Sequence, residues 1–285
     1  MQTFAYERPE TLAQAVTLLA AHGPGARLLA GGTDLIAGLR NGTLRPAVVV
    51  DLKHIPELSP AISEANGRLS ISADTVLADV ARDERIRSHF PALAEAAASV
   101  GAVQIRNRAT LAGNICNASP AADTAPPLLV YGAQVVAYGP LGVRRIPVDG
   151  FFVRSGETTL TADELVAAIE LPVPDRPAGS AFGRLTRRRG VDLATVSVCA
   201  SVNGSGITRL GYGAVGPRPL LAADDSGVLA DPAADPAARA SILARLAAAT
   251  SPISDIRASR EYRTDMLLLL TQRVLRAAIA RRAEG

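Results

Sequence analysis

The chain has 285 residues, of which 30 are basic and 27 acidic, so its formal net charge is only +3. This near balance argues against nucleic acid or a membrane surface as the partner. Aromatic residues make up 4% of the chain and tryptophan is absent, which also disfavours the stacking surfaces that bind single strands. The apolar content of 48% indicates a globular protein with a substantial core.

The chain has too few cysteines for an iron–sulfur cluster, and its histidines do not form a zinc site. Cys116 and Cys199 are the only cysteines, so four thiolates for an iron–sulfur cluster cannot come from this chain. The three histidines lack the spacing of a zinc site. The N-terminus has neither the basic nor the apolar segment of a signal peptide, and MLLLL at 266–270 is too short to span a bilayer. We therefore expect a cytoplasmic protein.

Helices and strands alternate in the first hundred residues. Apolar residues at helical spacing predict a helix that opens at residues 9–11 and stops at Gly23. Strands are then expected at 26–30, 46–52 and 67–73, and helices at 75–86 and 90–101. The β-turn-helix-β opening is typical of a nucleotide-binding unit, but the further alternating units of a dinucleotide fold do not follow.

The composition and the predicted secondary structure change at residue 104 and again beyond Pro177. Residues 104–130 are polar and rich in Gly, Asn, Ser and Pro, which predicts no simple regular element there. A hairpin around Gly139 and Pro140 is expected over 133–148, and a strand over 163–172. Beyond Pro177 we expect strands within 180–185 and 193–217, a helix at 236–250 and a terminal helix from about Ser259. We place a domain boundary near residue 176.

Gly31 and Gly32 interrupt an apolar run at the end of a predicted strand. An ordinary tight turn is one interpretation, because glycine tolerates positive φ. The alternative is that the missing side chains let backbone N–H groups converge on an anion such as a pyrophosphate. Thr33 would add a hydroxyl, and Asp34 would accept from a sugar hydroxyl or a ring N–H. The segment is neither a P-loop nor a GxGxxG motif.

A second segment of small residues favours the ligand interpretation. TLAGNICNASPAADTAPP, residues 110–127, places Gly113 beside Asn114 in a long loop, and long irregular loops are more often functional or mobile. Two such loops can hold one extended ligand from both sides. That arrangement suits a dinucleotide better than a mononucleotide.

The segments LLAGGTDL and TLAGNICNASPAAD resemble the two flavin-binding motifs of the FAD-carrying subunit of molybdenum hydroxylases. That group includes xanthine dehydrogenase, aldehyde oxidoreductase and carbon monoxide dehydrogenase. RLTRRRGVDLATVSV, YGAVGPRP and SPISDIRASREYRTDM resemble the C-terminal part of the same family, so the likeness covers essentially the whole chain. It implies an α+β FAD-binding fold of the vanillyl-alcohol-oxidase/PCMH type. Two FAD-binding subdomains, 1–57 and 58–176, would precede a small sheet-and-helix domain of the CO dehydrogenase flavoprotein type at 177–285.

The resemblance also implies which residues contact FAD, and it implies no catalytic residue in this chain. Residues 28–35 would wrap the cofactor, with Gly31 and Gly32 close to the pyrophosphate. Val166 would be an apolar contact, and Arg184 a cation that stabilises negative charge on a reduced ring. The full set is Leu28, Leu29, Ala30, Gly31, Gly32, Thr33, Asp34, Leu35, Val100, Gly101, Thr110, Gly113, Asn114, Asp123, Val166 and Arg184.

Two positions depart from the family pattern. Ala112 stands where the second motif usually has its first glycine, so close approach to a ligand there requires a negative φ. Thr33 and Asp34 stand where carbon monoxide dehydrogenases tend to carry His-Ser, which disfavours that branch. Outside the motifs, the run of Arg187, Arg188 and Arg189 is either a solvated face or a docking site for an acidic partner.

Cys116 and Tyr212 lie in or near the predicted flavin region. Cys116 is interpreted as a small apolar filler within the second loop. Tyr212 is either a core aromatic or a shield for the flavin ring, and an aromatic residue in a strand is more often core.

The resemblance implies an electron-transfer subunit. FAD would take electrons from a [2Fe-2S] partner subunit and pass them to an external acceptor. The molybdenum cofactor would lie in a large partner subunit, the assembly would be a dimer of heterotrimers, and the organic substrate would be a purine, another N-heterocycle or an aldehyde.

Two alternatives to this function remain open. One is a stand-alone flavin reductase of the same fold superfamily, like the enzyme that acts on UDP-N-acetylenolpyruvoylglucosamine. Such an enzyme would need a proton donor beside flavin N5 and a UDP-sugar site, and the sequence identifies neither. The other is a non-catalytic nucleotide-binding module.

Overall fold

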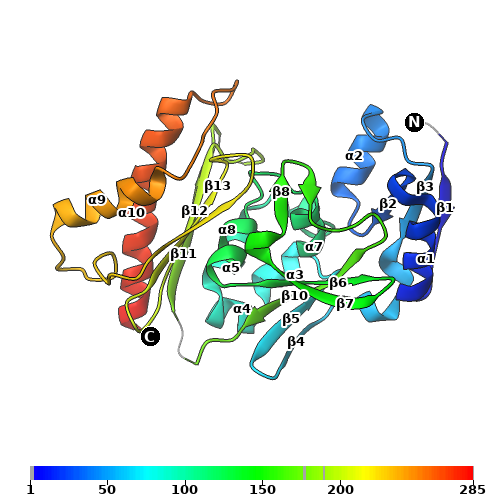
Figure 1. Cartoon of the computed structure of the whole chain (residues 1–285), viewed down its shortest axis with the longest axis horizontal. Coiled ribbons are helices and arrows are strands. Elements are labelled where there is room, and N and C mark those ends of the chain that lie inside the picture. Colours follow the sequence, from blue (N-terminus) through cyan, green and yellow to red (C-terminus); the bar gives the residue numbers. More distant parts are fainter. Residues whose placement is uncertain (1–2, 176–177, 189, 285) are drawn as a thin grey trace.

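The computed structural model describes residues 3–175, 178–188 and 190–284. Three regions follow one another along the chain, each built around its own sheet (Figure 1). The N-terminal region lies at one end of the molecule, the C-terminal region at the other, and the middle region between them. Short 3₁₀ turns occupy Gly23–Gly25, Leu52–His54, Pro56–Leu58 and Val148–Gly150.

The N-terminal region is a three-stranded parallel sheet with two helices. Its elements are β1 (Ala5–Glu7), α1 (Leu12–His22), β2 (Ala26–Leu29), α2 (Thr33–Asn41) and β3 (Val48–Asp51), and the strand order is β1-β3-β2. Thr11 caps α1 by accepting a hydrogen bond from the Gln14 N–H at 3.2 Å, and Gly23 ends it, which confirms the prediction. Because β2 and β3 are parallel, the loop at 30–32 begins at the carboxyl edge of this sheet, where ligands of open parallel sheets bind.

The middle region is a five-stranded antiparallel sheet covered by helices. Its strands, in spatial order, are β4 (Ile62–Ala65), β5 (Arg68–Ser72), β10 (Leu165–Pro172), β6 (Gln134–Gly139) and β7 (Gly142–Pro147). The predicted hairpin and the strand at 163–172 are confirmed, although Pro140 and Leu141 form the turn, and β4 was not predicted. A short hairpin follows, β8 (Phe152–Arg154) and β9 (Glu157–Thr158).

The single helix predicted at 75–86 is wrong. The chain forms two helices there, α3 (Leu77–Arg82) and α4 (Glu84–His89), before the expected α5 (Pro91–Ser99). Asp83 leaves the helical conformation, with φ −61° and ψ 127°. Its carboxylate accepts hydrogen bonds from the N–H groups of Arg85 at 3.0 Å and Ile86 at 3.2 Å, so it caps α4.

The polar stretch at 104–130 is also more regular than predicted. It contains parts or all of α6 (Val103–Arg106), α7 (Leu111–Cys116) and α8 (Ala125–Val130). Thr110 caps α7 through its side chain, and the two prolines of α8 lie in its first turn, where no N–H is needed. The Thr110 cap and the position of the two prolines therefore offset the low helix propensity of α7 and α8.

The C-terminal region is a four-stranded antiparallel sheet with two helices. Its elements, in chain order, are β11 (Gly179–Leu185), β12 (Val196–Val202), β13 (Thr208–Gly213), β14 (Leu220–Asp224), α9 (Pro236–Ala247) and α10 (Arg260–Glu284). The strands within 180–217 and both helices confirm the prediction, whereas β14 was not predicted. One face of the sheet packs on α10 and the other on α8 (Figure 1). The predicted boundary at 176 and 177 lies outside the described residues.

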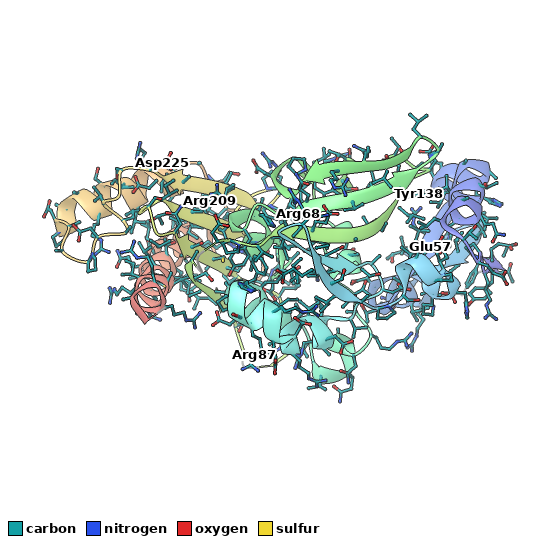
Figure 2. The ribbon with its side chains drawn as sticks, turned by 90° about the horizontal axis from the view of Figure 1, so that it is seen from below. Glu57, Arg68, Arg87, Tyr138, Arg209 and Asp225 are labelled. Carbon is teal, nitrogen blue, oxygen red and sulfur yellow. The ribbon has the colours of Figure 1, made fainter. Side chains whose placement is uncertain are left out.

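Charged residues of both signs lie on the surface. Figure 2 shows Glu57, Arg87 and Asp225, three exposed residues that lie in different regions of the molecule. Within the described ranges, every helix is too short or too polar to cross a membrane.

Asp74 is a buried carboxylic acid between the N-terminal and middle regions. It is 7% exposed, and its Oδ1 has no hydrogen-bond partner among the described residues. Burial raises its pKa from 3.8 to about 6, while nearby Lys53 partly opposes the shift. Folding therefore disfavours the ionised form of Asp74 relative to the unfolded chain.

We expect Asp74→Asn to stabilise the protein at pH 8 by up to about 3 kcal/mol, because each pKa unit corresponds to about 1.4 kcal/mol. The folded pKa is raised, so this destabilisation by Asp74 is absent below pH 3.8 and develops as pH rises through 6. Urea unfolding at pH 8 and near pH 4 measures the difference. A gain that is equal at both pH values would contradict the assignment.

Candidate functional site

The loop between β2 and α2 presents unpaired backbone donors. Gly32 adopts a left-handed conformation, with φ +76°, and forms the N-cap of α2 without a side-chain hydrogen bond. Within the described part of the chain, no acceptor pairs with the N–H groups of Thr33, Asp34 and Leu35. A helix start with free N–H groups carries partial positive charge and suits an anion such as a phosphate.

Gly31 brings this loop into contact with the second one. A Cβ added at Gly31 would lie 1.9 Å from the carbonyl oxygen of Arg108 and 3.0 Å from Cα of Ala109. The two backbones therefore touch directly, just before the second motif begins at Thr110. This contact accounts for the glycine, and proximity of Gly31 to a pyrophosphate stays a prediction.

The second loop is fixed by backbone pairing and by caps. Thr110 forms an antiparallel bridge with Val76, and the Leu77 N–H donates to the Ala109 carbonyl at 2.8 Å. The Thr110 hydroxyl accepts from the Gly113 N–H at 3.0 Å. Together these bonds hold the start of α7 beside the Gly31 loop, so the structure brings the two sequence motifs together.

Asn114 anchors the second half of the same loop. Its side-chain oxygen accepts a hydrogen bond from the Thr124 hydroxyl at 2.6 Å. Gly113 is exposed, and therefore leaves an open surface beside the anchored Asn114.

Ala112 does not disturb this arrangement. It lies within α7, is 6% exposed and is not among the residues with positive φ. Its helical backbone therefore has the negative φ that alanine requires, and its methyl group packs in the core. The departure from the Gly-Gly pattern is accommodated without strain.

Asp123 and Arg184 form a charged pair that joins the middle and C-terminal regions. Arg184 Nη1 donates to Asp123 Oδ2 at 2.5 Å, and both side chains are largely buried. Burial raises the pKa of Asp123 to about 6, and the Arg184 guanidinium opposes that shift. Asp123 Oδ1 is buried and has no hydrogen-bond partner among the described residues. An orphaned acceptor beside a cation suits a ring that carries N–H and carbonyl groups.

Val100 and Gly101 form a tight turn after α5. Gly101 has φ +53°, and Arg106 Nη1 donates to the carbonyls of Val100 at 3.0 Å and Gly101 at 3.3 Å. Arg106 was not predicted as a site residue. The only sequence signal for it is its place in the basic stretch that directly precedes the second motif.

The remaining predicted contacts are partly or fully buried side chains. Leu28, Leu29 and Ala30 are partly buried at the end of β2. Leu35 packs with Leu39 and Val49 beneath α2. Val166 is 5% exposed, where the β10–β6 register shifts between residues 166 and 168. Leu35 and Val166 are therefore part of the core, and their contact with a ligand stays a prediction.

Arg187, Arg188 and Tyr212 each make contacts within this chain. Arg187 pairs with Asp192 at 3.0 Å, and Arg188 Nε donates to the Val191 carbonyl at 2.9 Å, so both fold back onto their own loop. Arg189 lies outside the described residues. Tyr212 is fully buried in the C-terminal core, as the core interpretation predicted.

The described residues offer no metal centre. Their His, Cys, Asp and Glu side chains form no group of three that could hold an ion. Both cysteines are free, and burial raises the pKa of the Cys116 thiol to about 12, so it is unreactive as a thiolate. The free N–H groups at the start of α2 and the orphaned Asp123 Oδ1 suit an organic anion with a polar ring, and FAD fits this description.

Comparison with known proteins supports the same cofactor. The family model described as the FAD binding domain in molybdopterin dehydrogenase matches residues 2–174, and the CO dehydrogenase flavoprotein C-terminal domain matches residues 181–278. The chain is 34% identical over 281 residues to a putative xanthine dehydrogenase FAD-binding subunit of Escherichia coli K12, covering 97% of this chain and 96% of that protein.

Two relatives of known structure share the fold over their full length. The carbon monoxide dehydrogenase medium chain of Hydrogenophaga pseudoflava is 32% identical over 282 residues, or 98% of each chain. Its structure superposes with a TM-score of 0.90 and covers 99% of both chains. Quinoline 2-oxidoreductase from Pseudomonas putida 86 gives a TM-score of 0.87 at 28% identity, with 98% of both chains covered. The chain therefore belongs to the family of FAD-binding oxidoreductase subunits of molybdenum hydroxylases.

Proposed function

We propose that this chain is the electron-transfer subunit of a molybdenum-dependent hydroxylase. It receives electrons from a small [2Fe-2S] partner subunit and delivers them to an external acceptor. The observation that carries the proposal is the contact between the two motif loops at Gly31 and Arg108, because it places the free N–H groups at the start of α2 beside the beginning of the second motif. FAD, when bound there, supplies reversible redox chemistry that connects one-electron and two-electron partners.

Each part of the site has a distinct role in holding the cofactor. The N–H groups at the start of α2 bind the negatively charged pyrophosphate. Thr110, Gly113 and Asn114 form the opposite wall. Asp123 Oδ1 accepts from the flavin ring, and Arg184 favours negative charge on that ring.

The cofactors that oxidise the organic substrate lie in partner chains. Two cysteines cannot hold the iron–sulfur clusters, so these and the molybdenum cofactor belong to a small and a large subunit. We propose a cytoplasmic dimer of such heterotrimers, with domains at 1–57, 58–176 and 177–285 in this chain. The similarity to a xanthine dehydrogenase subunit and to quinoline 2-oxidoreductase supports a purine or another N-heterocycle as substrate, with an aldehyde as the alternative.

Purification of the chain alone tests this function. We expect it to bind one FAD and to react with an external acceptor, but to oxidise no purine, N-heterocycle or aldehyde. Full turnover of such a substrate by the isolated chain would contradict the subunit assignment and favour a self-contained enzyme. A chain that retains no flavin after gentle purification and does not bind added FAD would favour a nucleotide-binding module.

A further inference from the structure

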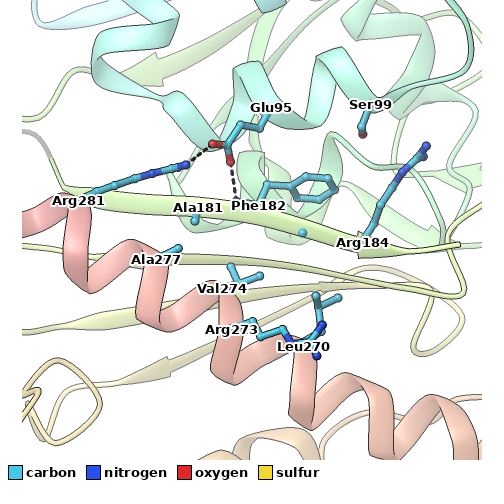
Figure 3. Close-up of a pocket in the computed structure, with 11 residues that line it drawn as sticks. Glu95, Ser99, Ala181, Phe182, Arg184, Leu270, Arg273, Val274, Ala277 and Arg281 are labelled. Carbon is cyan, nitrogen blue, oxygen red and sulfur yellow. Dashed lines mark hydrogen bonds and ion pairs between the residues drawn. The ribbon is translucent and has the colours of Figure 1, made fainter. Parts of the chain in front are cut away.

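A groove lies along the outer edge of β11, between α5 and α10 (Figure 3). Its volume is about 450 Å³. Glu95 and Ser99 of α5 form one wall, and Leu270 and Val274 of α10 form the other, with Phe182 and Gly183 of β11 between them. The groove is open to solvent along the strand, so it suits an extended chain better than an enclosed small molecule.

Only some of the outward-facing backbone groups of β11 have hydrogen-bond partners. The Phe182 N–H donates to Glu95 Oε2 at 2.9 Å, and the Ser180 carbonyl accepts from Arg281 Nη1 at 2.6 Å. Alternate residues of an antiparallel strand direct their backbone groups the same way. The carbonyl of Phe182 and the N–H of Arg184 therefore face outward too, and neither has a partner among the described residues beyond the sheet.

Basic residues outnumber acidic residues along this groove. Arg184, Arg273 and Arg281 line the groove, and Glu95 is the only acidic residue among the described residues that line it. Arg281 pairs with Glu95 at 2.5 Å and Arg184 pairs with Asp123. Arg273 is exposed on α10 and forms no ion pair within the described ranges. The groove therefore carries an uncompensated positive charge beside open backbone groups.

We propose that this groove receives an extended, acidic segment of a partner subunit, which adds as a strand to the edge of β11. Its backbone pairs with the Phe182 carbonyl and the Arg184 N–H, and a carboxylate of the segment pairs with Arg273. A second copy of this chain is disfavoured, because two such edges would bring their arginines together. The inference rests on the proposed function, since the segment belongs to the iron–sulfur or the molybdenum subunit.

Hydrogen exchange and a charge reversal test this surface together. Exchange of the 182–185 amides is measured by mass spectrometry in the FAD-loaded chain, alone and assembled with its partner subunits. The dissociation constant of the assembly is measured for Arg273→Glu and for Arg276→Glu. Arg276 is the matched control, because it is exposed on the same helix but does not line the groove.

We expect slower exchange at the Arg184 amide on assembly, and roughly tenfold weaker assembly for Arg273→Glu than for Arg276→Glu. Both variants should keep the wild-type FAD content and thermal midpoint.

An assembled complex with unchanged exchange at 182–185, or wild-type assembly of Arg273→Glu, overturns the inference alone. Protection in the isolated chain together with self-association overturns it in favour of a second copy. Failure to assemble with any such subunits overturns the proposed function as well.

Discussion

Replacing Gly31 with alanine is expected to abolish retention of FAD. The new Cβ would lie 1.9 Å from the Arg108 carbonyl oxygen and 2.7 Å from its carbon. Both are backbone atoms. The N–H groups of their segment, residues 107–109, donate to the carbonyls of Val103 and Ile105, and the Leu77 N–H donates to the Ala109 carbonyl. The two loops must therefore separate, and the donors at the start of α2 no longer face the same ligand as the second motif. We expect the dissociation constant for FAD to rise at least about 100-fold, or about 2.7 kcal/mol.

Gly25→Ala is the matched control for this substitution. It adds the same methyl group in the same region, but its Cβ would lie 3.5 Å from Ala47 Cβ, an ordinary contact. Isothermal titration of each variant with FAD gives the affinity, and circular dichroism verifies that each is folded. A folded Gly31→Ala variant that binds stoichiometric FAD with wild-type affinity would remove the basis for the loop contact.

Replacing Arg184 with glutamine is expected to lower the reduction potential of the bound flavin. Arg184 is the cation beside the buried Asp123 carboxylate. Without it, negative charge on a reduced ring would lose the stabilising cation proposed for this site. We expect a fall of about 30 mV or more, which for a two-electron couple corresponds to about 1.4 kcal/mol. The pKa of Asp123 should rise further, because the Arg184 guanidinium lowers it in the native protein.

An equilibrium redox titration of the FAD-loaded variants measures this effect. Arg209→Gln serves as the control, because Arg209 is an exposed arginine on β13 of the same sheet and contacts the Val130 carbonyl rather than Asp123. Equal potentials for wild type, Arg184→Gln and Arg209→Gln would show that Arg184 plays no part in the electrostatics of the flavin.

The sequence indicated where the loops lie but not how they meet. Two glycines after a strand signal a need for small residues, yet the same pattern serves a turn, a ligand or a neighbouring backbone. Only the fold reveals that Arg108 lies against Gly31. Contacts between residues 77 positions apart in the chain depend on tertiary packing, which local pattern does not encode.

The errors in helix prediction have local physical causes. Apolar spacing continues through 75–86 because α3 and α4 both bury residues in the same core. The break depends on one capping side chain, Asp83. In 104–130, glycine and proline content concealed three short helices; the Thr110 cap starts α7, and the prolines of α8 lie in its first turn.

Features that depend on the tertiary arrangement of the chain could not be predicted from sequence patterns. Arg106 supports the Val100–Gly101 turn through hydrogen bonds to carbonyls, and any basic residue looks alike in sequence. The groove at β11 depends on which strand lies at the edge of the sheet. Sequence patterns located that strand but could not order it among its neighbours.

The visible absorbance of the flavin, followed by rapid mixing, tests the central claim most directly. Organic substrate is mixed without oxygen with the intact assembly and, separately, with the isolated FAD-loaded chain. We expect the substrate to bleach the flavin band only in the assembly, because electrons reach this chain through the partner subunits. Bleaching of the isolated chain by the same substrate, or an assembly that turns over without any flavin bleaching, would contradict it.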